Sequence, residues 1–154
     1  MPNNLFLVDT SAWILALRKD FLPDVKDRIA YLLKENAIIT SSMIKLELLG
    51  GTKKKKEFQR LKSRLDALEM VETNTSLWER AYDLAYRLRR KGITVPYTDI
   101  LIAASALMVA ATVVHADSHF DLMEPHCGLK VESFVDATKK LSPDAGPLFV
   151  NQST

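Results

Sequence analysis

Short apolar runs alternate along this chain with longer stretches in which apolar residues recur every three or four positions. The runs Leu5–Val8 and Ala37–Thr40 are short and almost wholly apolar, as expected for strands that are covered on both faces of a parallel sheet. The same pattern predicts a strand at Thr112–Ala116 and a shorter one near Lys130–Ser133. Regular alternation of strands with helices favours an α/β fold.

Capping residues and glycines set the limits of the predicted helices. Ser76–Glu79 has the sequence of a capping box, and Thr98 is the expected cap of a helix in which Asp99 is the first residue. Ser118–Gly128 is predicted to be a turn region. The predicted helices cover residues 12–17, 25–34, 43–49, 52–68, 77–91, 99–110 and 134–141. Together these elements predict a three-layer α/β/α sandwich with a central, mostly parallel sheet.

The composition fits one folded domain. The chain has 154 residues, of which 47% are hydrophobic, which is enough to form a core. We assign the domain to residues 1–141. Residues 142–154 combine Pro143, Gly146 and Pro147 with small polar residues, so they are predicted to form a loose tail.

Cysteine usage and hydropathy suggest where the protein is found. Cys127 is the single cysteine, and the N-terminus lacks the order of basic, apolar and small residues of a secretory signal. The expected location is therefore the cytoplasm. The longest apolar stretch, Ile100–Val114, is shorter than the ~20 residues that span a bilayer, so no membrane association is expected.

Basic residues gather in two blocks, at residues 53–64 and 87–91, although the formal net charge is only +2. Such blocks are usually solvated helix faces; the alternative is contact with RNA phosphates, which would depend on salt and would not read sequence. An apolar stripe at helical spacing begins within the first block and runs past its end, and it predicts core or a dimer face, with an antitoxin groove as the further alternative. The stripe consists of Phe58, Leu61, Leu65 and Leu68.

Four acids stand beside predicted strand ends or helix starts. Asp9 follows the first strand, and Asp117 follows the strand Thr112–Ala116. Asp99 opens a helix, and Glu47 borders the apolar stripe of the helix after the second strand. Because parallel strands deliver ligand-contacting groups at their carboxyl ends, we expect these acids to converge.

A cluster of carboxylates needs a neutralising partner. Two unit charges ~4 Å apart repel by ~4 kcal/mol at a surface-like dielectric, so a proton or a cation must compensate them. An all-oxygen ligand set suits Mg²⁺, with Mn²⁺ as a substitute. Two such ions can activate water and stabilise the leaving oxygen of a phosphate ester, which points to phosphate chemistry.

Four sequence motifs, taken together, resemble the PIN domain. They are Leu-Val-Asp9-Thr-Ser11, Glu47-Leu-Leu-Gly50, Thr-Asp99-Ile-Leu-Ile-Ala-Ala104 and Val-Val-His-Ala-Asp117-Ser-His-Phe120. The resemblance covers about Leu5 to Leu141 and is strongest to the VapC-like toxins, which are small single-domain ribonucleases neutralised by an antitoxin. Each motif alone is weak, whereas their order and spacing jointly are specific.

The resemblance implies metal-dependent cleavage of RNA by activated water. It implies that Asp9 and Asp99 are the principal metal ligands and that Glu47 and Asp117 complete an acidic pocket. It also implies an antitoxin partner and a homodimer.

Three further residues enter as supporting residues of this expected site. Thr10 or Ser11 would orient the pocket, and Asp121 would be an outer acid. A hydroxyl residue is common in the family at the position of His115, so this chain departs from the pattern there.

Each acid also has a purely structural interpretation. Asp9 would serve as a helix cap, and Asp99 would complement a helix dipole. Glu47 would fit an ordinary exposed helix position, and Asp117 a turn. All four structural interpretations must hold together to remove the site.

Other functions stay open at this point. A housekeeping RNA-processing PIN nuclease would share the site, whereas a catalytically silent RNA- or protein-binding PIN module would share only the fold. A phosphotransferase with Asp9 as nucleophile is disfavoured, because Ser11 stands where a second acid is expected.

The histidines and the cysteine raise the possibility of zinc, which their spacing disfavours. His126 and Cys127 are adjacent, and the distances to His115 and His119 match no standard zinc pattern. His119 is interpreted as a packed or solvated histidine, with contact to substrate or to an outer carboxylate as the alternative, and it is not counted among the site residues.

Overall fold

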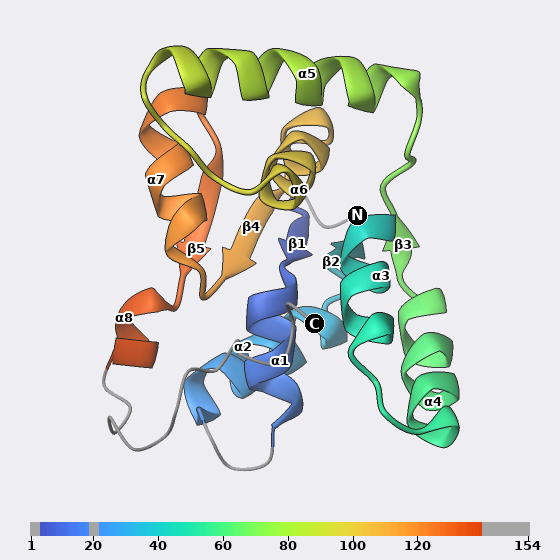
Figure 1. Ribbon diagram of the computed structural model, residues 1–154. Helices are drawn as coiled ribbons and strands as arrows, with labels where there is room; N and C mark the ends of the chain where they lie inside the picture. Colours follow the sequence, from blue (N-terminus) through green and yellow to red (C-terminus); the bar gives the residue numbers. More distant parts are fainter. Residues whose placement is uncertain (1–3, 19–21, 140–154) are drawn as a thin grey trace.

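The computed structural model describes residues 4–18 and 22–139. Its centre is a five-stranded parallel sheet with the strand order β3-β2-β1-β4-β5, visible from right to left in Figure 1. The strands are β1 (Phe6–Val8), β2 (Ile38–Thr40), β3 (Glu69–Met70), β4 (Thr112–His115) and β5 (Lys130–Ser133). This arrangement confirms the predicted α/β class with a central parallel sheet.

Helices connect all the strands. They are α1 (Thr10–Leu17), α2 (Pro23–Lys34), α3 (Ser42–Gly50), α4 (Lys55–Asp66), α5 (Thr75–Arg90), α6 (Tyr97–Met108), α7 (Ser118–Cys127) and α8 (Val135–Lys139). Crossovers between parallel strands are right-handed, so the connections that lead from β1 to β3 and those that lead from β3 to β5 lie on opposite faces. The result is the predicted three-layer sandwich.

The strand order reverses at β1. Val8 of β1 is aligned with Val114 of β4, while Leu7 is aligned with Ile39 of β2 on the other side. The next residue, Asp9, donates its backbone N–H to the carbonyl oxygen of Val114 at 2.9 Å. In open parallel sheets the crevice beyond the carboxyl ends at such a reversal is where ligands bind.

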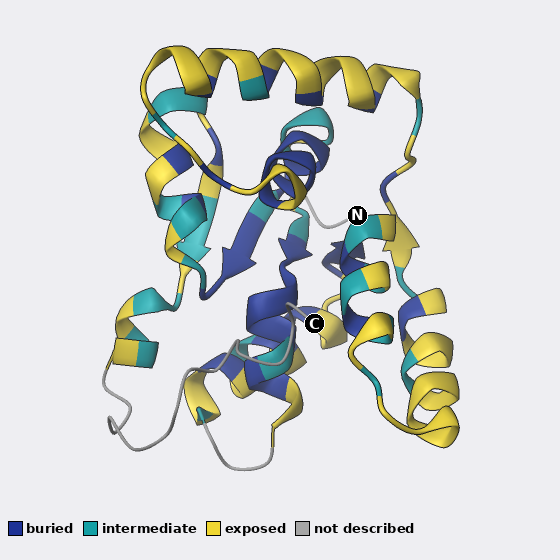
Figure 2. Cartoon of the chain, viewed as in Figure 1, coloured by how far each residue is buried: buried dark blue, intermediate teal, exposed yellow. Residues whose placement is uncertain are grey.

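The core contains the central strands together with residues of α6 and of the other helices that pack on the sheet. In Figure 2 the central strands and α6 are almost wholly buried, whereas α5 presents an exposed outer face. Ile102, Ala103 and Ala106 of α6 are completely inaccessible to solvent, as are Val113 and Val114 of β4. Burying a valine or isoleucine side chain contributes ~1.5–3 kcal/mol, so this packing fixes the start of α6 relative to the strand ends.

Two predicted features of the helices are wrong. The segment predicted as a turn region forms α7, which Asp117 caps at its start and which Gly128 ends at a φ of 73°. Helix α5 begins at Thr75, and its cap is Asn74, whose side chain accepts a hydrogen bond from Leu77 N at 2.9 Å. The expected capping box at Ser76 is therefore not the cap.

The start of α6 also differs from the prediction. Pro96 is the N-cap, and its carbonyl oxygen accepts hydrogen bonds from the backbone N–H groups of Asp99 and Ile100. Proline is tolerated at this position because the N–H that it lacks would have no partner within the helix. Asp99 is thus the third helical residue, and Thr98 is not the cap.

The apolar stripe on α4 is mainly core. Leu65 is buried, Leu61 and Leu68 pack against the core, and Phe58 keeps 37% of its surface exposed. The predicted tail, residues 142–154, and the last two residues of the predicted helix 134–141 lie outside the described residues. Within the described part of the chain, no helix is both long enough and apolar enough to cross a membrane.

Candidate active site

Asp9 is buried at the end of β1 and is held by its neighbour Ser11. The Asp9 side chain is the N-cap of α1: its Oδ2 accepts hydrogen bonds from Ser11 N at 3.0 Å and from Ser11 Oγ at 2.6 Å. Ser11 Oγ in turn accepts a hydrogen bond from Ala116 N at 2.9 Å. This chain of bonds ties the end of β1 to the end of β4 and fixes the carboxylate between them.

Glu47 reaches the same region from α3. Thr10 Oγ1 donates a hydrogen bond of 3.0 Å to Glu47 Oε1, and Thr10 itself is only 3% exposed. Glu47 is half-buried. The bond connects α1 with α3 and orients one of the two carboxylate oxygens.

Asp99 and Asp117 meet around a histidine. Nδ1 of His119 lies 2.9 Å from Asp99 Oδ2 and 3.0 Å from Asp117 Oδ1. Asp117 caps α7, because its Oδ1 also accepts a hydrogen bond from the backbone N–H of His119 at 2.9 Å. Each of the three side chains offers one ligand atom, and these atoms all lie within 4.8 Å of one another.

The acids perturb one another electrostatically. Burial raises the pKa of Asp9 to about 7, against the lowering effect of the Ser11 hydrogen bonds, and the charges of Asp99 and Glu47 raise it further. Burial, followed by the charge of Asp117, raises the pKa of Asp99 to about 6, although His119 opposes the shift. Burial also raises the pKa of Glu47, with a contribution from Asp117. The structure therefore brings all four predicted acids close enough to interact electrostatically.

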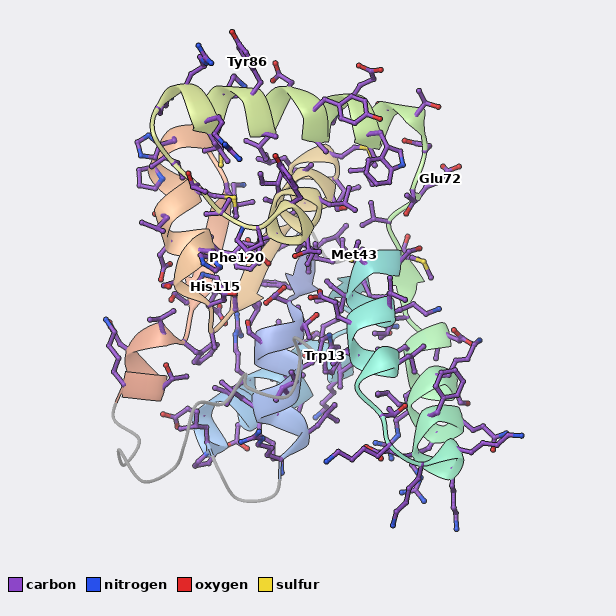
Figure 3. The ribbon with its side chains drawn as sticks, viewed as in Figure 1. Trp13, Met43, Glu72, Tyr86, His115 and Phe120 are labelled. Carbon is purple, nitrogen blue, oxygen red and sulfur yellow. The ribbon has the colours of Figure 1, made fainter. Side chains whose placement is uncertain are left out.

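His115 positions Asp117 through a hydrogen bond to its backbone. Its side chain is fully buried against the ring of Phe120, with ring centroids 5.1 Å apart, and Figure 3 shows the two side chains together between β4 and α7. His115 Nδ1 accepts a hydrogen bond from the backbone N–H of Asp117 at 3.2 Å. Burial lowers the pKa of this imidazole, so the neutral ring acts as the acceptor that positions Asp117.

Asp121 lies outside the cluster of four acids. Its Oδ1 is 3.3 Å from Nε2 of His115, a close approach without hydrogen-bond alignment, and its Oδ2 accepts a hydrogen bond from Ser133 Oγ at 2.9 Å. Among the described residues, Asp121 meets the site through the imidazole of His115, which in turn accepts a hydrogen bond from Asp117 N. Its role as an outer acid of the site stays a prediction.

His119 is the residue of this site that the sequence interpretation left out. Only the fold shows its contact with Asp99, because the two residues are twenty positions apart and belong to different helices. The available signal was its position two residues after Asp117, in the first turn of a helix that was itself not predicted. The structure shows the alternative that the sequence left open for this histidine, contact with carboxylates, because its partly exposed imidazole lies beside Asp99 and Asp117.

The structural interpretations of the acids are partly correct as well. Asp9 and Asp117 do cap helices, as each accepts a backbone hydrogen bond. A cap needs no charge, however, because asparagine or serine caps a helix about as well. A charged side chain with only 3% exposure, as at Asp9, costs folding free energy that capping alone does not explain.

The donor set fits a divalent cation. Carboxylate oxygens are the preferred ligands of Mg²⁺ and Mn²⁺, and several anionic groups that repel one another gain most from a shared cation. The atoms that Asp99, Asp117 and His119 offer, within 4.8 Å of one another, are close enough to share one ion. The charge of Asp99 raises the pKa of Asp9, so Asp9 lies near the same position.

Known proteins share both the sequence pattern and the fold. The family model of the PIN domain matches residues 6–124. Ribonuclease VapC11 of Mycobacterium tuberculosis is 31% identical over 134 residues, which are 84% of this chain and 99% of the relative. Ribonuclease VapC2 of Rickettsia felis is 30% identical over 115 residues, 71% of this chain and 84% of the relative. The chain belongs to the PIN-domain family of VapC ribonucleases.

Solved structures of other PIN-domain proteins have the same fold. A chain of the VapBC structure of Salmonella typhimurium bound to DNA superimposes with a TM-score of 0.70 at 22% identity, covering 85% of this chain and 98% of that chain. The VapBC2 complex of Rickettsia felis bound to a promoter DNA fragment gives a TM-score of 0.69 at 24% identity, covering 84% and 98%. At these identities the likeness concerns the fold, which agrees with the sheet and helices described above.

Proposed function

We propose that this PIN-domain protein is a Mg²⁺-dependent endoribonuclease that hydrolyses RNA phosphodiester bonds as the toxin of a toxin–antitoxin pair. The observation that supports this most directly is the convergence of Asp9, Glu47, Asp99 and Asp117 from four segments of the chain. The proposed ligands are Asp9 and Asp99, with Glu47 and Asp117 completing the acidic pocket. Ribonuclease relatives that cover most of the chain support the same activity.

The protein's own residues prepare the pocket for this chemistry. Ser11 holds Asp9 through two hydrogen bonds, and Thr10 holds Glu47 through one, so these carboxylates need little rearrangement to accept a ligand. A bound divalent ion supplies Lewis-acid activation of water and neutralises charge on the scissile phosphate. The raised pKa values of Asp9 and Asp99 mean that both groups must lose protons before they can serve as ligands.

A purified-protein assay tests the proposed activity. Asp99→Asn should abolish cleavage of RNA in Mg²⁺ while the circular dichroism spectrum and the melting temperature stay those of a folded protein. Asp136→Asn is the matched control, because Asp136 is an exposed acid on α8 whose partner is Lys139, and this variant should cleave normally. Cleavage by Asp99→Asn at the wild-type rate, or by the wild type in excess EDTA, would overturn the proposal.

We also propose that an antitoxin segment docks in the cleft between α1, α3 and α4. Leu17, Leu48 and Leu61 give this cleft an apolar wall, and Glu47 reaches it from the acidic pocket. An occupant of the cleft would therefore lie directly beside the proposed active site. The related VapBC structures are toxin–antitoxin complexes, which supports a partner of this kind.

The homodimer and the cytoplasmic location remain predictions. Helix α5 carries an exposed row of aromatic side chains, Trp78, Tyr82 and Tyr86, and Figure 3 shows Tyr86 projecting outward from it. This row supports self-association through α5. Light scattering at several concentrations would test it, and a monomer throughout would contradict it.

Two alternatives remain distinguishable by experiment. A housekeeping PIN nuclease would cleave RNA but would have no neighbouring reading frame for a small antitoxin. A silent binding module would show neither Mn²⁺ binding nor metal-dependent cleavage of any RNA. Clustered acids with raised pKa values favour the catalytic alternative, because such perturbed groups gather at functional sites.

A further inference from the structure

His119 lies between two of the four acids, and its imidazole has no role in the function proposed so far. Its Nδ1 lies 2.9 Å from Asp99 Oδ2 and 3.0 Å from Asp117 Oδ1, and its side chain is 37% exposed on the solvent side of the pocket. The backbone of His119 is fixed by the N-terminal turn of α7, which Asp117 caps. The imidazole is thus directed at the proposed metal centre by the helix that carries it.

We propose that His119 supplies a nitrogen ligand, through Nδ1, to the metal centre together with Asp99 and Asp117, and that this nitrogen makes the centre prefer Mn²⁺ to Mg²⁺. The inference rests on the proposed metal-dependent function. Mg²⁺ favours sites made only of oxygen, whereas a site with an imidazole suits transition metals better. The ligand atoms of these three residues lie within 4.8 Å of one another, so one ion can contact them all.

A purely electrostatic role for His119 predicts the opposite result. If the imidazole served only to neutralise Asp99 and Asp117 with its own proton, it would compete with an incoming cation. Removing it would then tighten the binding of Mn²⁺ and of Mg²⁺ alike. If it is a ligand, removing it weakens Mn²⁺ binding and leaves Mg²⁺ binding nearly unchanged.

His119→Gln distinguishes these roles in the full-length protein, with titration calorimetry of Mn²⁺ and of Mg²⁺. Loss of a ligand should weaken Mn²⁺ binding at least about tenfold, since even the loss of a group behind the ligands costs ~10–100-fold. The change for Mg²⁺ should stay within about threefold. Unchanged or tighter Mn²⁺ binding by His119→Gln would overturn the inference.

Pulsed EPR of the Mn²⁺-loaded protein gives a readout that does not depend on affinity or activity. The wild type should show a nitrogen hyperfine coupling that is absent in His119→Gln. His126→Gln is the matched control, because His126 lies on the last turn of the same helix, and it should keep the coupling. Coupling that persists in His119→Gln would exclude Nδ1 as the ligand.

The same measurements separate this inference from the proposed function. Wild-type protein that binds Mn²⁺ and cleaves RNA, but shows no nitrogen coupling, would refute only the role of His119. Wild-type protein that binds neither Mn²⁺ nor Mg²⁺ would refute the proposed function and the inference together. Asp99→Asn should lose affinity for both ions. This variant is the control that shows whether the titrations report on the acidic cluster.

Discussion

Replacing Asp9 by asparagine should make the metal-free protein more stable, although it should destroy the active site. Asparagine can still accept the hydrogen bond from Ser11 N and caps a helix about as well as aspartate. What it removes is the buried negative charge and the repulsion from Asp99 and Glu47. The variant therefore isolates the energetic cost of the pocket.

The size of this effect follows from the pKa of Asp9. Burial raises it from 3.8 to about 7, so at pH values between these two the folded protein keeps a proton that the unfolded chain releases. The stability of the wild type consequently falls as the pH rises through this window, by about 4 kcal/mol in all and by about 2–3 kcal/mol between pH 5 and pH 8. Asp9→Asn lacks this penalty.

Urea denaturation in EDTA at pH 5 and pH 8 measures the difference. The gain in unfolding free energy from Asp9→Asn should be larger at pH 8 than at pH 5 by about 2–3 kcal/mol. Asp66→Asn is the control, because Lys45 and Lys62 lower the pKa of that exposed acid and its effect should not vary over this range. Equal effects of Asp9→Asn at both pH values would refute the argument that a buried charge strains the pocket.

Three further predictions follow from the same contacts. Mn²⁺ affinity should rise from pH 5.5 to pH 8, because Asp9 and Asp99, with pKa values of about 7 and about 6, lose their protons in this range; titration calorimetry giving the same affinity throughout would contradict it. Ser11→Ala removes the link between the ends of β1 and β4 and should lower the free energy of unfolding in urea by ~1–3 kcal/mol. An unchanged denaturation midpoint would contradict this. Glu132→Gln breaks a partly exposed ion pair with Arg28 and should lower the free energy of unfolding by less than ~1 kcal/mol, with Mn²⁺ affinity unchanged. A loss of Mn²⁺ binding would contradict this.

The central strands were predictable from the sequence because they are buried on both faces. Continuous apolar runs mark β1, β2 and β4, and the acids that follow β1 and β4 lie where the sheet reverses its strand order. The short edge strand β3 was not predictable. Its residues Glu69 and Met70 are both exposed and join the sheet only through their backbones, so no hydrophobic pattern marks it.

Contacts between residues far apart in the sequence limited the prediction of the site. Asp9, Asp99 and Asp117 were predicted as site residues because each lies at a strand end or a helix start, which is a local feature of the sequence. Glu47 was predicted because it borders the apolar stripe of its helix. The contact of His119 with Asp99 depends on α6 and α7 lying side by side. Helix α7 was itself hidden, since Pro125 lies inside it and only Phe120 and Met123 are buried.

A crystal structure with Mn²⁺ tests the central claim most directly. The claim is that acids from four segments of the chain create a pocket which a divalent ion makes stable and active. Anomalous density is predicted between Asp9 and Asp99, within reach of Asp117, and should vanish in crystals of Asp99→Asn. Crystals soaked at pH 8 that show no anomalous density among these acids would contradict the account.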